Sequence, residues 1–276
     1  MLGRKKIGVA LSGGGARGLS HIGVLQVLED IGVNISAVSG CSMGAIVGAA
    51  YCAGVDLKEI EKFISSTDWK SFLLFSVFSL SKTGIINERK IDDVLKRFLG
   101  DKTFKDCRKE FCCVAVDILG GKKVVLKDGI LREAVRASIS VPGIFPPVLK
   151  NESFLVDGGI VEPLPAESIK KLGANFIIAS SIIFESDGFS AGAGKKADLK
   201  DKEIKKLSIQ TIIDKSVSIM HKQMVESYLG SANIVIEPKI GDFGFFDFAR
   251  GAQIIEAGRK AAVEKIPEIK RKLRIR

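Results

Sequence analysis

The residues best suited to chemistry lie in Gly40-Cys41-Ser42-Met43-Gly44, where a serine stands two positions from a glycine on each side. This spacing matches G-x-S-x-G, in which a nucleophilic serine occupies a sharp turn from a strand into a helix. The glycines are needed because side chains there would collide with neighbouring backbone. Residues 35–39 predict a short strand, and the small apolar residues 45–51 predict a buried helix. The sequence therefore predicts a strand-turn-helix around Ser42.

A second feature is the glycine-rich run Ser12-Gly13-Gly14-Gly15-Ala16-Arg17-Gly18, between a predicted buried strand at 5–11 and a predicted helix. Backbone N–H groups in such a loop form an anion site at the positive end of the helix dipole. The same glycines fit the dinucleotide pattern G-x-G-x-x-G, but residues 38–42 lack the carboxylate expected for the ribose. The alternative is an oxyanion hole for a serine that attacks a carbonyl.

Ser42 also needs a general base, and the sequence leaves two alternatives open. Asp157 follows a short predicted strand at 154–156 and precedes Gly158 and Gly159. Ser42, Asp157 and His221 occur in the Ser-Asp-His order of the α/β-hydrolases. However, only one strand clearly precedes the serine, and His221 falls within a predicted helix. The second alternative is a dyad of Ser42 and Asp157. His21 is expected to pack near the glycine loop.

Charge and composition limit the possible binding partners and the cellular compartment of the protein. Lys and Arg exceed Asp and Glu by 42 to 32, a formal charge of +10, which favours contact with a polyanion. The basic clusters lack interleaved aromatic residues, so a membrane surface is expected and nucleic acid is not. Five cysteines without C-x-x-C spacing, and only two histidines, indicate reduced thiols and no metal site. With no signal peptide or long apolar run visible, we expect a cytoplasmic protein, peripheral at the inner face of the membrane.

Strands alternate with helices along the chain, which predicts an α/β layered domain with a mainly parallel sheet. We expect one domain over 1–276, with a core at about 5–185. A mobile loop is expected at about 186–202, where Gly, Ser, Ala and Lys predominate. Helices and a basic tail are expected over 206–276, including a helix at 249–273. The apolar stretch at 72–80 is either core, an acyl-chain pocket or a membrane-facing flap.

Four motifs, taken in order, resemble those of the bacterial patatin-like phospholipases. They are Gly13 to Gly18, Gly40 to Gly44, Ala137-Ser138 through Phe145-Pro146-Pro147-Val148, and Asp157-Gly158-Gly159. The similarity extends to residues 241–248, so it covers nearly the whole chain. It implies a three-layer α/β/α sandwich with a mainly parallel central sheet. It also implies hydrolysis of lipid esters through a serine–aspartate dyad, with no cofactor.

The resemblance assigns the residues of the site. Ser42 is the expected nucleophile and Asp157 the base, with the N–H groups of Gly13, Gly14, Gly15 and Met43 as the oxyanion hole. The supporting positions are Arg17, Gly18, Gly40, Gly44, Gly158 and Gly159. Arg17 is expected to fix the loop or to meet a lipid phosphate. The chain departs from the family at Glu162, where relatives often have asparagine, and we expect altered hydrogen bonding there.

The expected reaction forms an acyl-enzyme at Ser42, and the expected substrate is a phospholipid, a lysophospholipid or a simpler ester. An ordinary aspartate, with a pKa of about 3.9, is a weak base for a hydroxyl, so Asp157 must be desolvated and well placed. The competing function is a non-catalytic protein that binds an anion or acyl-CoA in the glycine loop.

Overall fold

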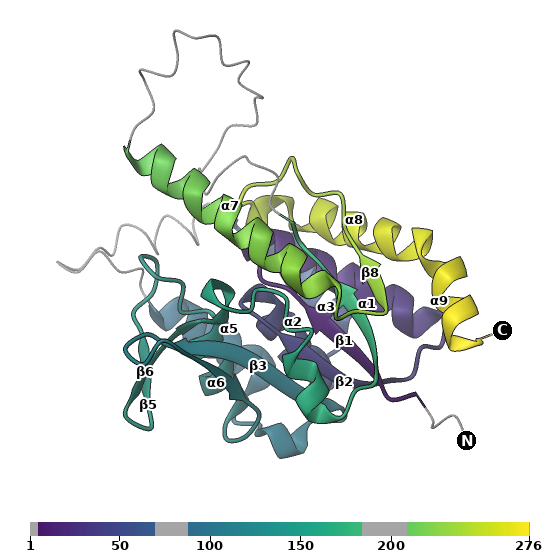
Figure 1. Cartoon of the computed structure of the whole chain (residues 1–276), viewed down its shortest axis with the longest axis horizontal. Coiled ribbons are helices and arrows are strands. Elements are labelled where there is room, and N and C mark those ends of the chain that lie inside the picture. Colours follow the sequence, from purple (N-terminus) through teal and green to yellow (C-terminus); the bar gives the residue numbers. More distant parts are fainter. Residues whose placement is uncertain (1–4, 70–87, 184–208, 276) are drawn as a thin grey trace, which may run out of the picture.

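The structure is a computed structural model that describes residues 5–69, 88–183 and 209–275 (Figure 1). The apolar stretch at 72–80 and the loop expected at 186–202 lie outside the described residues. Among the residues described, no helix combines the length and the apolar character needed to cross a bilayer.

A central sheet organises the fold, with strand order β5-β6-β3-β2-β1-β7-β8 and with β4 paired to β3. The run from β3 through β2, β1 and β7 to β8 is parallel, and β4, β5 and β6 add antiparallel pairs at one side. The predicted mainly parallel sheet is confirmed. The strands are β1 (Ile7–Leu11), β2 (Ile35–Gly40), β3 (Glu110–Asp117), β4 (Lys122–Leu126), β5 (Val148–Lys150), β6 (Ser153–Asp157), β7 (Phe176–Ser180) and β8 (Ile234–Ile236).

Alternation along the strands sends side chains into two separate cores, because successive residues of a strand point to opposite faces. In β1, Val9 and Leu11 belong to the larger core, whereas Ala10 belongs to the smaller one. In β7, Ile178 belongs to the larger core and Ile177 to the smaller one. Both faces of the sheet are therefore covered, as expected for parallel strands.

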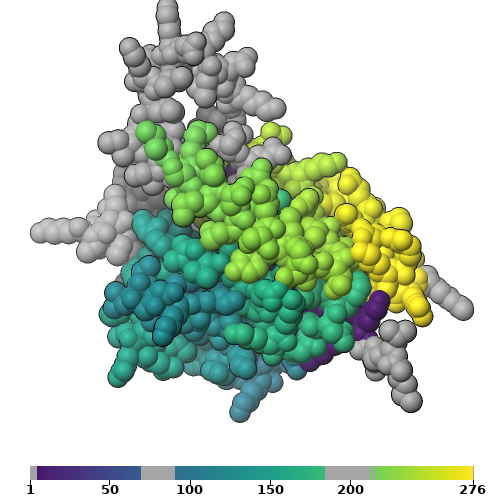
Figure 2. All heavy atoms as spheres, in the orientation of Figure 1, coloured from purple at the N-terminus to yellow at the C-terminus, as the bar shows by residue number. Residues whose placement is uncertain are grey.

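The larger core lies under most of the helices, and the smaller core lies under α7 and the segment around residues 164–174. Figure 1 shows α7 running across one face, and Figure 2 shows its atoms packed against the middle and the C-terminal part of the chain. The predicted three layers are thus confirmed. The helices are α1 (Ser20–Asp30), α2 (Met43–Cys52), α3 (Leu57–Ser66), α5 (Glu88–Leu99), α6 (Leu131–Ser138), α7 (Ile209–Leu229), α8 (Gly251–Glu264) and α9 (Ile266–Leu273).

The expected last helix at 249–273 is two helices, α8 and α9, with Pro267 in the first turn of α9. Proline lacks an N–H and is accepted at the first turn of a helix but disrupts its interior. The apolar residues keep helical spacing across this junction, so the sequence pattern predicted one helix where the structure has two.

Candidate active site

Ser42 occupies the sharp turn between β2 and α2, as the spacing predicts. Its φ of +53° and ψ of −123° are unfavourable for a residue with a side chain. A Cβ at Gly40 would lie 2.4 Å from the Gly44 carbonyl oxygen, and one at Gly44 would lie 2.3 Å from the Leu11 carbonyl oxygen. Only glycine fits at these two positions, so the turn places β1, β2 and α2 in close contact around the serine.

Strand register brings Asp157 to the same place. In β3, Cys113 pairs with Gly40 of β2, and Ala115 pairs with Asp157 of β6. Ser42 and Asp157 therefore meet beside the carboxyl end of β3, although 114 residues separate them in the sequence. Both side chains are nearly covered: Ser42 is 8% exposed and Asp157 is 4% exposed.

The Asp157 carboxylate is buried and is bonded through one of its oxygens. Its Oδ1 accepts hydrogen bonds from the Gly159 amide at 2.7 Å and from the Cys41 thiol at 3.6 Å. Its Oδ2 is buried without a hydrogen-bond partner of normal geometry among the described residues. Burial raises the pKa of Asp157 to about 6, and the Ser42 side chain is first among the groups that pull it back down. A buried carboxyl with a raised pKa is better suited than an ordinary aspartate to accept a proton near neutral pH.

The proposed oxyanion donors do not all remain available. The Gly13 amide donates to the Pro163 carbonyl at 2.9 Å, so its assignment as a donor is corrected: it anchors the loop. The amide of Ser42 is also engaged, with Ser138 Oγ at 3.2 Å. Within the part of the chain that is described, the amides of Gly14, Gly15 and Met43 have no acceptor. These three N–H groups can still meet a developing oxyanion.

The glycine loop is tied to the segment at 243–245. The Ala16 amide donates to the Phe245 carbonyl at 2.8 Å, and buried Arg17 donates from Nε to the Phe243 carbonyl. Gly15 has a φ of +56°, and a Cβ there would lie 2.5 Å from the Phe245 oxygen. Gly18 packs against Met43, which follows the serine. Of the two expected roles of Arg17, these contacts favour fixing the loop.

Neither histidine contacts the serine or the aspartate within the described residues. His21 is buried, with Nδ1 at 2.7 Å from Ser180 Oγ and Nε2 at 2.9 Å from the Ser12 carbonyl oxygen. His221 lies on α7 near Arg17. Its pKa is lowered to about 4, mainly by burial and secondly by the positive charge of Arg17. Asp157 accepts hydrogen bonds from Cys41 and Gly159, and neither imidazole is among its hydrogen-bond partners in the described residues. This geometry favours the dyad over the triad.

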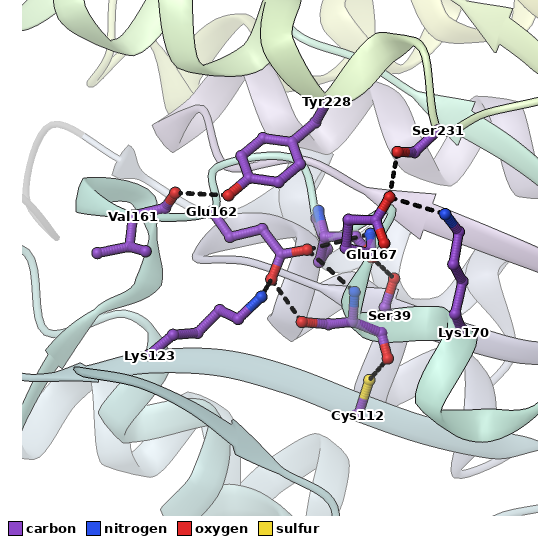
Figure 3. A network of polar contacts seen from close by, with 11 residues as sticks. Ser39, Cys112, Lys123, Val161, Glu162, Glu167, Lys170, Tyr228 and Ser231 are labelled. Carbon is purple, nitrogen blue, oxygen red and sulfur yellow. Dashed lines mark hydrogen bonds and ion pairs between the residues drawn. The ribbon is translucent and has the colours of Figure 1, made fainter.

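Glu162 lies at the centre of a network of hydrogen bonds and ion pairs (Figure 3). Its fully buried carboxylate accepts hydrogen bonds from the amides of Glu167 and Ser168, at 3.1 and 3.0 Å, and from the Ser168 hydroxyl. Lys123 Nζ pairs with it at 2.8 Å, which supplies the opposite charge that a buried carboxylate needs. This network fixes the segment that carries Pro163 and Pro165, whose carbonyls bind the Gly13 amide and the Ser39 hydroxyl.

An apolar cavity of about 150 Å³ opens beside Ser42. Its walls come from α2, α3, α5 and the segments at 139–145 and 245–248, and include Val47, Ala50, Phe98 and Trp69. Among the described residues that line it, Ser42 has the only polar side chain besides the indole of Trp69, whose N–H donates to the Ile64 carbonyl at 2.7 Å. The sequence pattern did not predict this cavity, because its walls come from distant segments. Among the described residues, no group of acidic, His or Cys side chains is arranged to hold a metal ion.

Comparisons with known proteins place this geometry in a family. Residues 9–169, more than half of the chain, match the model of the patatin-like phospholipase family. An uncharacterized NTE family protein of Mycobacterium tuberculosis is 36% identical over 193 residues, which cover 70% of this chain and 52% of that protein. Lysophospholipase NTE1 of Candida glabrata is 34% identical over 188 residues, covering 66% of this chain and 11% of that protein.

The solved structures that match include the type III effector ExoU of Pseudomonas aeruginosa. It is 13% identical, with a TM-score of 0.45, and the match covers 96% of this chain and 53% of that chain. The chain spans about half the length of the mycobacterial relatives that it matches. The family model and the sequence identity to the mycobacterial protein decide the assignment: the chain belongs to the patatin-like phospholipase family.

Proposed function

We propose that the chain is a serine acyl hydrolase that cleaves lipid esters through a dyad of Ser42 and Asp157. The observation that carries this proposal is the placement of a strained serine beside a buried carboxylate with a raised pKa. The three amides without acceptors and the apolar cavity beside Ser42 support it. The Ser-His-Asp alternative receives no support from the positions of His21 and His221.

The proposed reaction has two steps. In the first, Asp157 takes the proton of the Ser42 hydroxyl while Oγ bonds to the ester carbonyl carbon. The oxyanion is stabilised by the N–H groups of Gly14, Gly15 and Met43, each worth on the order of 10²–10³ in rate. The carbon–oxygen bond to the alcohol breaks, and the alcohol leaves with the proton from Asp157. In the second, Asp157 takes a proton from water, hydroxide attacks the acyl carbon, and Ser42 recovers its proton as the fatty acid leaves.

The cavity supports an acyl chain as the group bound beside Ser42. A cavity of about 150 Å³ with apolar walls is large enough to accept a small hydrocarbon group. It reaches Ala50, eight residues beyond Ser42 on α2, which is about 12 Å along the helix axis. Lysophospholipids are the first substrates to test, because a relative is named a lysophospholipase.

We expect Ala50→Leu to shorten this cavity and so to discriminate against long acyl chains. The kcat/KM for a dodecanoyl ester should fall about 10-fold relative to the acetyl ester, measured with nitrophenyl esters and with lysophospholipids of matching chain length. Ala252→Leu, which makes the same change at an exposed position of α8, should leave this ratio unchanged. If the wild-type protein binds these lipids but releases no fatty acid, the non-catalytic alternative is correct.

A basic surface supports peripheral attachment to anionic lipid. The last turn of α9 carries Lys270, Arg271 and Lys272, followed by Arg274, and the chain has a formal charge of +10. Lys272 also pairs with Glu268 at 2.9 Å. Each basic residue near an anionic surface contributes about 1 kcal/mol. We expect sedimentation with phosphatidylserine liposomes at low salt and little with phosphatidylcholine liposomes. Equal binding to both, or binding that persists in high salt, would contradict this attachment.

A further inference from the structure

The residue before the nucleophile contacts the proposed base. Cys41 is fully buried, and its Sγ lies 3.6 Å from Asp157 Oδ1. Burial, and next the Asp157 charge, raise the pKa of this thiol well above its ordinary value, so it remains protonated. A protonated thiol is a hydrogen-bond donor. Cys41 therefore donates to Asp157, while its neighbour Ser42 lies beside the same carboxyl group.

The two oxygens of Asp157 are in different situations. Oδ1 accepts from the Gly159 amide and from the Cys41 thiol, so both of its lone pairs are engaged. Oδ2 is buried and has no hydrogen-bond partner of normal geometry in the described part of the chain. An unpartnered buried acceptor is costly, and it is often found where a catalytic group is needed.

We propose that Cys41 is a positioning residue, whose thiol, together with the Gly159 amide, holds Asp157 Oδ1 and leaves Oδ2 to take the Ser42 proton. This role rests on the proposed function. The sequence pattern did not predict it, because position 41 is variable in G-x-S-x-G and its partner lies 116 residues away.

The electrostatic surroundings make this role measurable. The groups that lower the pKa of Asp157 are the Ser42 side chain, the Gly159 amide and the Cys41 thiol, and no charged group of the described residues is among them. Glu162 and Cys113 act on Cys41 instead. Removing the thiol donor should therefore raise the pKa of the base without other changes in charge.

The test is the pH dependence of kcat/KM for nitrophenyl acetate between pH 4.5 and 9. In Cys41→Ala the acid limb should move up by about half a unit to one unit, and kcat should fall about 3- to 10-fold with little change in KM. Cys41→Ser, which keeps a donor, should return both quantities towards the wild type. Cys52→Ala removes the buried thiol at the end of α2, which does not contact Asp157, and should leave the acid limb and kcat unchanged. Cys41→Val removes the donor but fills the space, and serves if the alanine variant does not fold.

Two outcomes separate this role from the proposed function. An acid limb that stays at the wild-type pH in Cys41→Ala or Cys41→Val overturns the role of Cys41 alone. Hydrolysis that persists in Ser42→Ala overturns the proposed function and this role with it.

Discussion

Ser42→Ala should lower ester hydrolysis by on the order of 10³-fold or more, because no attacking oxygen remains beside the amides of Gly14, Gly15 and Met43. Hydrolysis of a nitrophenyl ester and of a lysophospholipid measures this loss. The amides of Gly14, Gly15 and Met43 and the apolar cavity should survive the change, so binding of a non-hydrolysable lipid should be retained.

The control for this prediction is the stability of the turn. A φ of +53° with a ψ of −123° disfavours any side chain, and such strain costs on the order of 1–3 kcal/mol. Ser42→Gly should therefore be inactive but more stable than Ser42→Ala in urea unfolding. An active Ser42→Ala protein, or a glycine variant that is less stable than the alanine variant, would contradict this account of the turn.

Asp157→Asn is expected to have the second large effect, a loss of on the order of 10³-fold in kcat with the fold retained. Asparagine can still accept from the Gly159 amide, but it cannot take a proton from Ser42. In the wild type, kcat/KM should rise with pH and level off above the Asp157 pKa of about 6. An acid limb far from pH 6, or activity in the asparagine variant, would contradict the role of Asp157 as base.

The same substitution should increase stability at pH 8. The pKa of Asp157 rises from 3.8 to about 6 on folding, so the folded state binds the proton more tightly. Its contribution to stability is therefore fully present below pH 3.8 and is lost as pH rises through 6. This difference of about two pKa units corresponds to at most about 3 kcal/mol in the free energy of unfolding. In urea titrations, Asp157→Asn should be more stable than the wild type by about 1–3 kcal/mol at pH 8, and the difference should shrink towards pH 4. If Asp157→Asn is less stable than the wild type at pH 8, the ionised carboxylate of Asp157 does not destabilise the folded state as proposed.

Local features of the site could be predicted from the sequence, because their causes lie within a few residues. The turn at Ser42 needs glycine at positions 40 and 44, and both close contacts are made by neighbouring strands or by the turn itself.

The resemblance supplied the pairing of Ser42 with Asp157, but other contacts between distant segments could not be predicted from the sequence. The glycine-loop pattern and the resemblance assign the Gly13 amide to the oxyanion hole, but that amide donates to the carbonyl of Pro163, 150 residues later. That carbonyl is held by the Glu162 network, whose partner Lys123 comes from β4. The contact of the Cys41 thiol and the cavity that Ala50 lines depend in the same way on residues that only the folded chain brings together.

Labelling by a fluorophosphonate, located by peptide mass spectrometry, tests the dyad most directly, because the reagent bonds only to an activated serine. The dyad predicts a single adduct on Ser42, formed at the wild-type rate in His221→Ala and far more slowly in Asp157→Asn. An adduct on another serine, or rapid labelling of Asp157→Asn together with slow labelling of His221→Ala, would contradict it.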